Sequence, residues 1–98
     1  MTLVWTGVAK RDIQSIYDYI ARDSVYYAEE YTDKLINSVE RLKDFPYSGR
    51  VVPEIGDKSV REVIYGSYRL MYHVDEETDT VSITQVSHGA QQFRLHEE

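Results

Sequence analysis

The hydrophobic pattern of this chain changes its period once, at residues 45–49. Before this point, apolar residues recur at the three- and four-residue spacing of amphipathic helices, and after it they alternate as they do in strands. Proline disfavours the helical conformation of the residue before it, and glycine permits a chain reversal, so Pro46 and Gly49 indicate where the helical part ends. The chain is therefore predicted to fold as an α+β protein.

The part before this point predicts a helical hairpin. The pair Asp23-Ser24 interrupts the helical pattern and offers a side-chain oxygen that can cap the next helix. The second helix is expected to continue until Phe45-Pro46. The apolar stripes comprise Ala9, Ile13, Ile16, Tyr17 and Ile20 in the first helix, and Ala28, Tyr31, Leu35, Val39 and Leu42 in the second.

Strands are predicted on both sides of the hairpin. Residues 2–6 are β-prone and precede a glycine, which indicates a first strand. Residues 60–65, 68–74 and 80–87 predict a three-strand meander, preceded by a short strand at Val51-Val52. Residues 89–98 are expected to form a short terminal helix. The resulting α+β fold has a strand, then a two-helix hairpin packed on one face of an antiparallel sheet, then the C-terminal meander, with the other sheet face partly free.

Length and composition restrict the kind of protein. A chain of 98 residues has room for one domain, so residues 1–98 are expected to form a single domain. The chain has no cysteine, which favours a reducing compartment. Its longest apolar run covers only residues 25–28, whereas a membrane span needs about 20 residues. A cytoplasmic protein without a membrane partner is therefore expected.

Motifs with a specific chemistry are absent from the sequence. It contains neither a phosphate-binding glycine loop nor a His-Glu-x-x-His pair. His73, His88 and His96 lie on different predicted elements without a second ligand at a metal spacing, so no metal and no cofactor are expected. The net charge of −6 opposes unspecific attraction to a nucleic-acid backbone.

Five short segments occur in a characteristic order: Phe45-Pro-Tyr-Ser-Gly-Arg50, Val52-Pro-Glu54, Val60-Arg-Glu-Val-Ile64, Gly66-Ser-Tyr-Arg-Leu-Met-Tyr72 and Val86-Ser-His-Gly-Ala90. Together they resemble the ParE/RelE toxin superfamily, and the resemblance covers about residues 3–93. It implies the toxin of a bacterial type II toxin–antitoxin pair, of the kind associated with plasmid stabilisation. Such a toxin is wrapped and neutralised by a cognate antitoxin, so an oligomer with that partner is expected.

One branch of this superfamily implies an enzyme. RelE-like members are ribosome-dependent endoribonucleases, and metal-independent cleavage of mRNA needs a base, a cation at the phosphate and an acid at the leaving oxygen. By this resemblance Glu54 would be the catalytic base, Arg69 the phosphate clamp and His88 the acid. Structural roles are equally open to these residues, since Arg69 could satisfy a nearby carboxylate.

The other branch implies a toxin without an active site of its own. ParE-like members poison DNA gyrase, and the chain resembles them in its Gly66-Ser-Tyr-Arg69 segment and in its Val86-x-His-Gly-Ala90 ending. Gly89 stands where some nuclease members carry a tyrosine, while Gln91 and Gln92 stand where many ParE-like members have an arginine and an acidic residue. The acidic charge balance favours a protein target over ribosomal RNA. Inhibition of gyrase is therefore preferred over two alternatives, cleavage of ribosome-bound mRNA and a decayed toxin that only binds its antitoxin.

Overall fold

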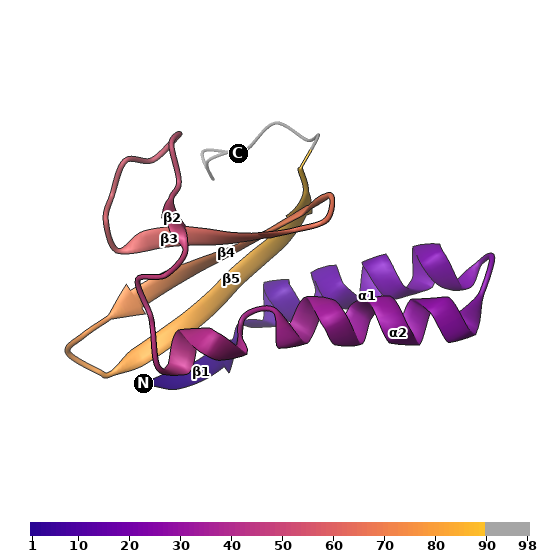
Figure 1. Ribbon diagram of the computed structural model, residues 1–98, viewed down its shortest axis with the longest axis horizontal. Helices are drawn as coiled ribbons and strands as arrows, with labels where there is room; N and C mark the ends of the chain where they lie inside the picture. Colours follow the sequence, from indigo (N-terminus) through magenta and orange to yellow (C-terminus); the bar gives the residue numbers. More distant parts are fainter. Residues whose placement is uncertain (90–98) are drawn as a thin grey trace.

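Helices come first and most of the strands follow, as the change of hydrophobic period predicts. The computed structural model describes residues 1–89 (Figure 1). Its elements are β1 (Thr2–Trp5), α1 (Gly7–Ala21), α2 (Val25–Asn37), a 3₁₀ turn η1 (Glu40–Lys43), β2 (Arg50–Val51), β3 (Val60–Tyr65), β4 (Tyr68–Asp75) and β5 (Thr80–His88).

The two helices form the predicted hairpin and lie side by side in Figure 1. Thr6 and Ser24 are their N-caps, and each side-chain oxygen accepts a hydrogen bond from a backbone N–H in the first turn, that of Ala9 at 3.2 Å and that of Tyr27 at 3.1 Å. The Thr6 hydroxyl also donates to the carbonyl of Ile83 at 3.0 Å. The cap of α1 therefore fixes the start of this helix against β5.

The second helix ends earlier than the sequence predicts. The apolar stripe suggests a helix up to Phe45-Pro46, but α2 ends at Asn37 and the chain continues as η1. The Ser38 hydroxyl donates to the carbonyl of Leu35 at 2.6 Å, and this local bond competes with continuation of the helix. Val39 and Leu42 are still fully buried, because the 3₁₀ turn keeps the stripe pointed at the core.

The sheet contains five strands in the order β1-β5-β4-β3-β2. The predicted meander is confirmed, since β3, β4 and β5 pair with their neighbours in antiparallel orientation. The first strand differs from the expectation of an antiparallel sheet, because β1 pairs with β5 in parallel and the sheet is mixed. The helical hairpin brings the chain back before the meander begins, so β1 and β5 run in the same direction along one edge (Figure 1).

The hydrophobic core lies between the hairpin and one face of the sheet. Alternation along β4 places Leu70, Tyr72 and Val74 in this core, as the sequence predicts. The buried Tyr72 hydroxyl donates to the carbonyl of Pro46 at 2.8 Å and accepts from the N–H of Gly49 at 3.0 Å, which anchors the loop before β2. The buried core residues are Ala9, Ile16, Leu35, Val39, Leu42, Val63, Leu70, Tyr72, Val74, Val81, Ile83 and Val86.

None of the helices in residues 1–89 is sufficiently long and apolar to cross a membrane. The terminal helix expected at residues 89–98 falls, apart from Gly89, outside the described part of the chain.

Candidate functional site

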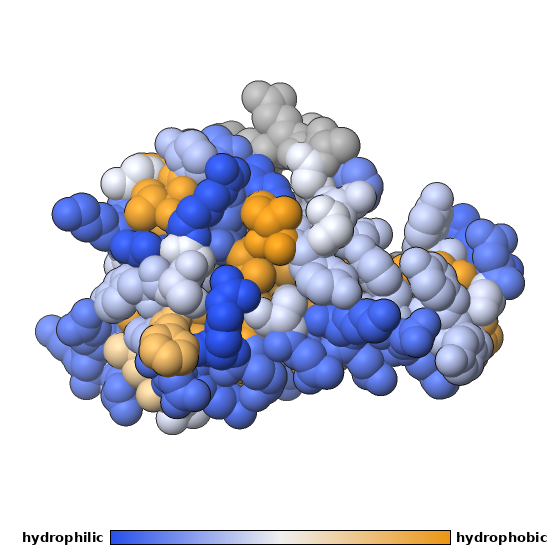
Figure 2. Space-filling view, viewed as in Figure 1, coloured by the Kyte–Doolittle hydropathy of each residue, from blue (hydrophilic) through white to orange (hydrophobic). Residues whose placement is uncertain are grey.

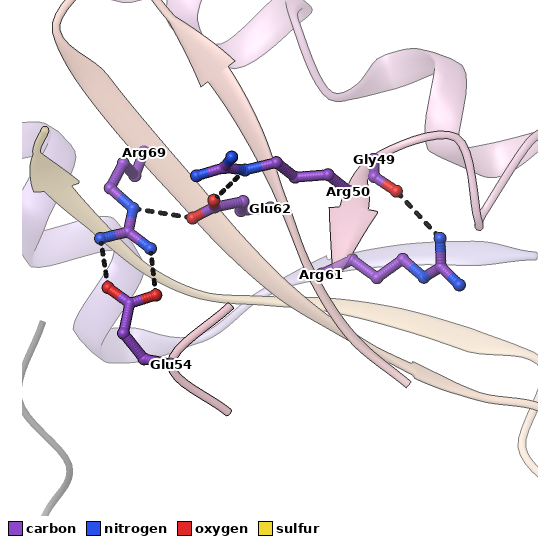
Figure 3. A network of polar contacts seen from close by, with 6 residues as sticks. All are labelled: Gly49, Arg50, Glu54, Arg61, Glu62 and Arg69. Carbon is purple, nitrogen blue, oxygen red and sulfur yellow. Dashed lines mark hydrogen bonds and ion pairs between the residues drawn. The ribbon is translucent and has the colours of Figure 1, made fainter. Parts of the chain in front are cut away.

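The sheet face opposite the helices carries a network of charged side chains, which we call the arginine–carboxylate network: Arg50, Glu54, Glu62 and Arg69 (Figure 3). The short turn at Gly66-Ser67 sets the register of β3 and β4, so that Glu62 lies opposite Met71 and Ile64 lies opposite Arg69. Residues two apart on a strand share a face, and this register makes Glu62 and Arg69 diagonal neighbours.

Arg69 donates hydrogen bonds from all of its guanidinium nitrogens. Its Nε lies 2.7 Å from one oxygen of Glu62, while Nη1 and Nη2 lie 3.1 and 3.0 Å from the two oxygens of Glu54. The second oxygen of Glu62 accepts from Nε of Arg50 at 2.5 Å. A substrate phosphate would therefore have to displace a carboxylate before it could bind Arg69 through paired hydrogen bonds.

The members of the network differ sharply in exposure. The Glu62 side chain is completely buried and that of Arg69 is 10% exposed, whereas those of Glu54 and Arg50 are 41% and 60% exposed. A buried carboxylate needs charged partners, and Glu62 has two arginines. Glu62 and Arg69 thus form the buried centre of the network, with Glu54 and Arg50 at its exposed rim.

The ion pair with Arg69 also changes the acidity of Glu54. Hydrogen bonds from the Arg69 guanidinium hold the pKa of the Glu54 carboxyl below its ordinary value, and the same bonds raise the pKa of Arg69. A general base for RNA cleavage works best with a pKa near the working pH, and Glu54 is shifted away from that range.

The third residue expected from the resemblance lies apart from this pair. His88 ends β5 opposite Tyr68, so it shares a sheet face with Tyr68 and not with Arg69. Its ring contacts that of Tyr68 edge to face, with 5.4 Å between the centroids. His88 and Arg69 nevertheless both border one open hollow of about 520 Å³ at the β3–β4 turn. Glu54 therefore contacts Arg69 directly, whereas His88 lies at the end of β5 on the sheet face that Tyr68 occupies.

Sequence reasoning missed two members of the network, Glu62 and Arg50. A glutamate within a strand ordinarily indicates a solvent-facing position, yet Glu62 is 1% exposed. Its position could have been found from the Gly66-Ser67 turn, because a two-residue connection fixes the cross-strand partners and brings Glu62 beside Arg69. Nothing in the sequence marks Arg50 in this way.

The described residues contain no cluster of metal ligands. Within residues 1–89, no three histidine, aspartate or glutamate side chains converge as they would around a metal ion. His73 and His88 lie at opposite ends of the β4–β5 pair, and His96 lies outside the described range.

The lowered pKa of Glu54 predicts a specific pH dependence of stability. Its ordinary value is 4.5, and because the folded-state value is lower, the ion pair stabilises the folded chain above about pH 4.5 and loses its effect as the pH falls through the folded-state value. We expect Glu54→Gln to be less stable than the parent near neutral pH and equally stable at the acidic end. Because the variant lacks one carboxyl group, the difference in the free energy of unfolding should change with pH as expected for the binding of at most one proton.

Urea unfolding at a series of pH values measures this difference. Glu77→Gln is a suitable control, because Glu77 is exposed in the β4–β5 turn and lies outside the network. A stability difference between Glu54→Gln and the parent that stays constant over the acidic range would contradict the prediction.

A helical hairpin on one face of a five-stranded mixed sheet defines an α+β protein with the RelE/ParE-like fold. Residues 3–93 match the family described as ParE toxin of type II toxin-antitoxin system, parDE. The chain belongs to this family, and it is a toxin of the ParE/RelE superfamily. A comparison with curated protein sequences gives no significant match.

Solved structures of toxin–antitoxin proteins have the same fold. The chromosomal ParDE system of P. aeruginosa is similar with a TM-score of 0.73 at 21% identity, over 90% of this chain and 95% of that one. The RelBE2 complex of Mycobacterium tuberculosis is similar with a TM-score of 0.57 at 26% identity, over 92% of both chains. The isolated RelE toxin of E. coli gives 0.59 at 16% identity, over 93% of this chain and 86% of that one. The RelE/ParE-like fold expected from the sequence is thereby confirmed.

Proposed function

We propose that this protein is a toxin that inhibits DNA gyrase and that a cognate antitoxin neutralises it. The match to the ParE family over residues 3–93 supports the gyrase branch over the ribonuclease branch. The structures titled ParDE system and RelBE2 toxin–antitoxin complex support an antitoxin as the partner. The acidic net charge of −6 is also easier to reconcile with a protein target than with ribosomal RNA.

One observation favours gyrase inhibition over RNA cleavage: the hydrogen-bond donors of Arg69 are bound by carboxylates of the chain itself. A phosphate clamp must present unpaired donors to the developing charge of the transition state. Here Glu54, the residue expected to act as base, fills the same donors that a phosphate would need. We infer that Glu54 pairs with Arg69 in the free chain, and that toxicity does not depend on proton transfer by Glu54 and His88.

The proposal is tested with one set of preparations in two assays. We expect the purified chain to inhibit supercoiling by gyrase and to leave ribosome-bound message intact in a translating extract. Glu54→Ala and His88→Ala are expected to retain most of this inhibition, and to stop bacterial growth when expressed. Co-expression of the cognate antitoxin should restore growth.

A ribonuclease would give the opposite pattern. Loss of a positioned acid or base lowers cleavage by about 10²–10⁴-fold, so both variants would lose toxicity while still binding antitoxin. Cleavage of message by the parent chain that disappears in both variants, with supercoiling unaffected, would show that the target is mRNA. Normal growth of cells that contain the folded parent chain would instead support the alternative that the chain is a decayed toxin that only binds its antitoxin.

A further inference from the structure

The exposed end of Arg50 has unused hydrogen-bond donors. Its Nε donates to Glu62, whereas its two terminal nitrogens have no hydrogen-bond partner among residues 1–89. The side chain is 60% exposed, and Figure 3 shows its guanidinium reaching past Glu62 toward Arg69. Guanidinium donors of this kind match the geometry of a planar anion such as a carboxylate.

These donors border a hollow whose charged lining residues are both arginines. The hollow of about 520 Å³ at the β3–β4 turn is lined by Arg50 and Arg69, together with His88 and with neutral residues. None of the described residues that line it carries a carboxylate, although the chain has 17 acidic side chains and a net charge of −6. The lining therefore favours an anionic ligand.

The terminal nitrogens of Arg69 are already bound by a carboxylate of the chain, that of Glu54, which is not among the residues that line the hollow. This carboxylate binds Nη1 and Nη2 of Arg69 with both oxygens, as an external carboxylate would. Glu54 reaches the arginine from the exposed loop between β2 and β3, and its own side chain is 41% exposed, so solvent partly screens this ion pair. Glu62 is fully buried and cannot leave without exposing an unpaired charge, so Glu54 is the partner that can be exchanged.

We propose that Arg50 and Arg69 form a binding site for an aspartate or glutamate side chain of a protein partner, and that Glu54 occupies this site in the free chain. An incoming carboxylate would displace Glu54 from Arg69 and bind the terminal nitrogens of Arg50 as well. The exchange keeps the charge of the network constant, because one carboxylate replaces another beside the same two arginines. This inference does not depend on whether gyrase is the target.

The charges of the network favour a carboxylate over the phosphates of RNA. The charges of the two arginines are balanced by Glu54 and Glu62, so a chain of phosphates would add negative charge to a network that is already neutral. The net charge of −6 repels a polyanion as it approaches. A single acidic side chain on an otherwise neutral peptide adds the least repulsion.

The test uses acetyl-Gly-Glu-Gly-amide as the probe and titrates it into the full isotope-labelled chain, followed by NMR. The amide signals of Arg50, Ser67 and Arg69 are expected to shift. Glu54→Gln should bind the peptide about three- to tenfold more tightly, because the internal competitor is lost. Arg50→Gln should weaken binding by about tenfold or more. Arg11→Gln and Glu77→Gln, at exposed positions outside the network, change the charge in the same way and should leave the affinity close to that of the parent.

Three outcomes would overturn the proposal. The first is equal affinity of the parent, Glu54→Gln and Arg50→Gln for the peptide. The second is equal binding of acetyl-Gly-Gln-Gly-amide, which has no carboxylate. The third is that Glu54→Gln binds the dinucleotide UpU more tightly than it binds the peptide, with the same amide signals shifted. That result would mean that the site binds phosphate. If Glu54→Gln lacks a cooperative unfolding transition, the comparison of Arg50→Gln with Arg11→Gln decides.

Discussion

Replacement of Arg69 by leucine is expected to lower the free energy of unfolding by about 3–5 kcal/mol, because it removes one partner of a buried ion pair. Glu62 would keep only Arg50, which approaches from the exposed rim, and the Glu62 oxygen that now accepts from Arg69 would lose its donor. Most of the cost comes from the buried Glu62 oxygen that has lost its donor and from the lost charge partner. The exposed contact with Glu54 adds little, because solvent screens it.

A double variant separates the charge effect from the loss of side-chain volume. Glu62→Leu together with Arg69→Leu removes both buried charges, and it should be more stable than Arg69→Leu alone. Lys43→Leu is the matched control, since Lys43 pairs with Glu40 at 2.8 Å and both side chains are about half exposed. It should change the free energy of unfolding by less than about 1 kcal/mol. Denaturant unfolding in which Arg69→Leu costs no more than Lys43→Leu would disprove a buried pair at this position.

Replacement of Leu35 or Leu70 by alanine should cost about 2–5 kcal/mol, from the lost burial and the cavity that remains. Leu35 belongs to α2 and Leu70 to β4, and both are fully buried in the one core that joins the hairpin to the sheet. Because the two positions come from opposite layers, similar losses at both would show that the layers share one core.

Chemical denaturation with a matched surface control checks this prediction. Val8→Ala removes apolar atoms from α1 at a side chain that is 47% exposed, and it should cost less than about 1 kcal/mol. A loss at Leu35 or Leu70 no larger than that at Val8 would mean that the face of the helix or strand has been assigned wrongly.

Most of the fold could be predicted because its signals are local. The Ser24 cap, the helical stripes and the alternation along β4 each depend on residues that are neighbours in the sequence. The direction of β1 and the early end of α2 could not be predicted in this way. A strand of four residues has the same side-chain pattern whichever way its partner runs, and the hydrophobic stripe of α2 continues into η1 although the helix itself has ended.

The candidate site was harder to predict than the fold, because it depends on contacts across strands. Glu54 and Arg69 were singled out by resemblance, but nothing in that resemblance placed them in contact with each other. Glu62 holds the network together and has no motif of its own. Its role follows from the register of β3 and β4, which the turn at Gly66-Ser67 determines.

The parallel pairing of β1 with β5 also bears on when this chain can fold. Thr2 lies beside Thr80, so the first strand pairs with a segment about 80 residues further along the chain. At synthesis rates of about 5–20 residues per second, the partner of β1 is made roughly 4–16 s after β1 itself. Contacts between such distant segments also slow folding, because a long loop must close first. A nascent chain that stops before Thr80 therefore contains the residues of the helical hairpin but lacks the strand on which β1 and α1 pack.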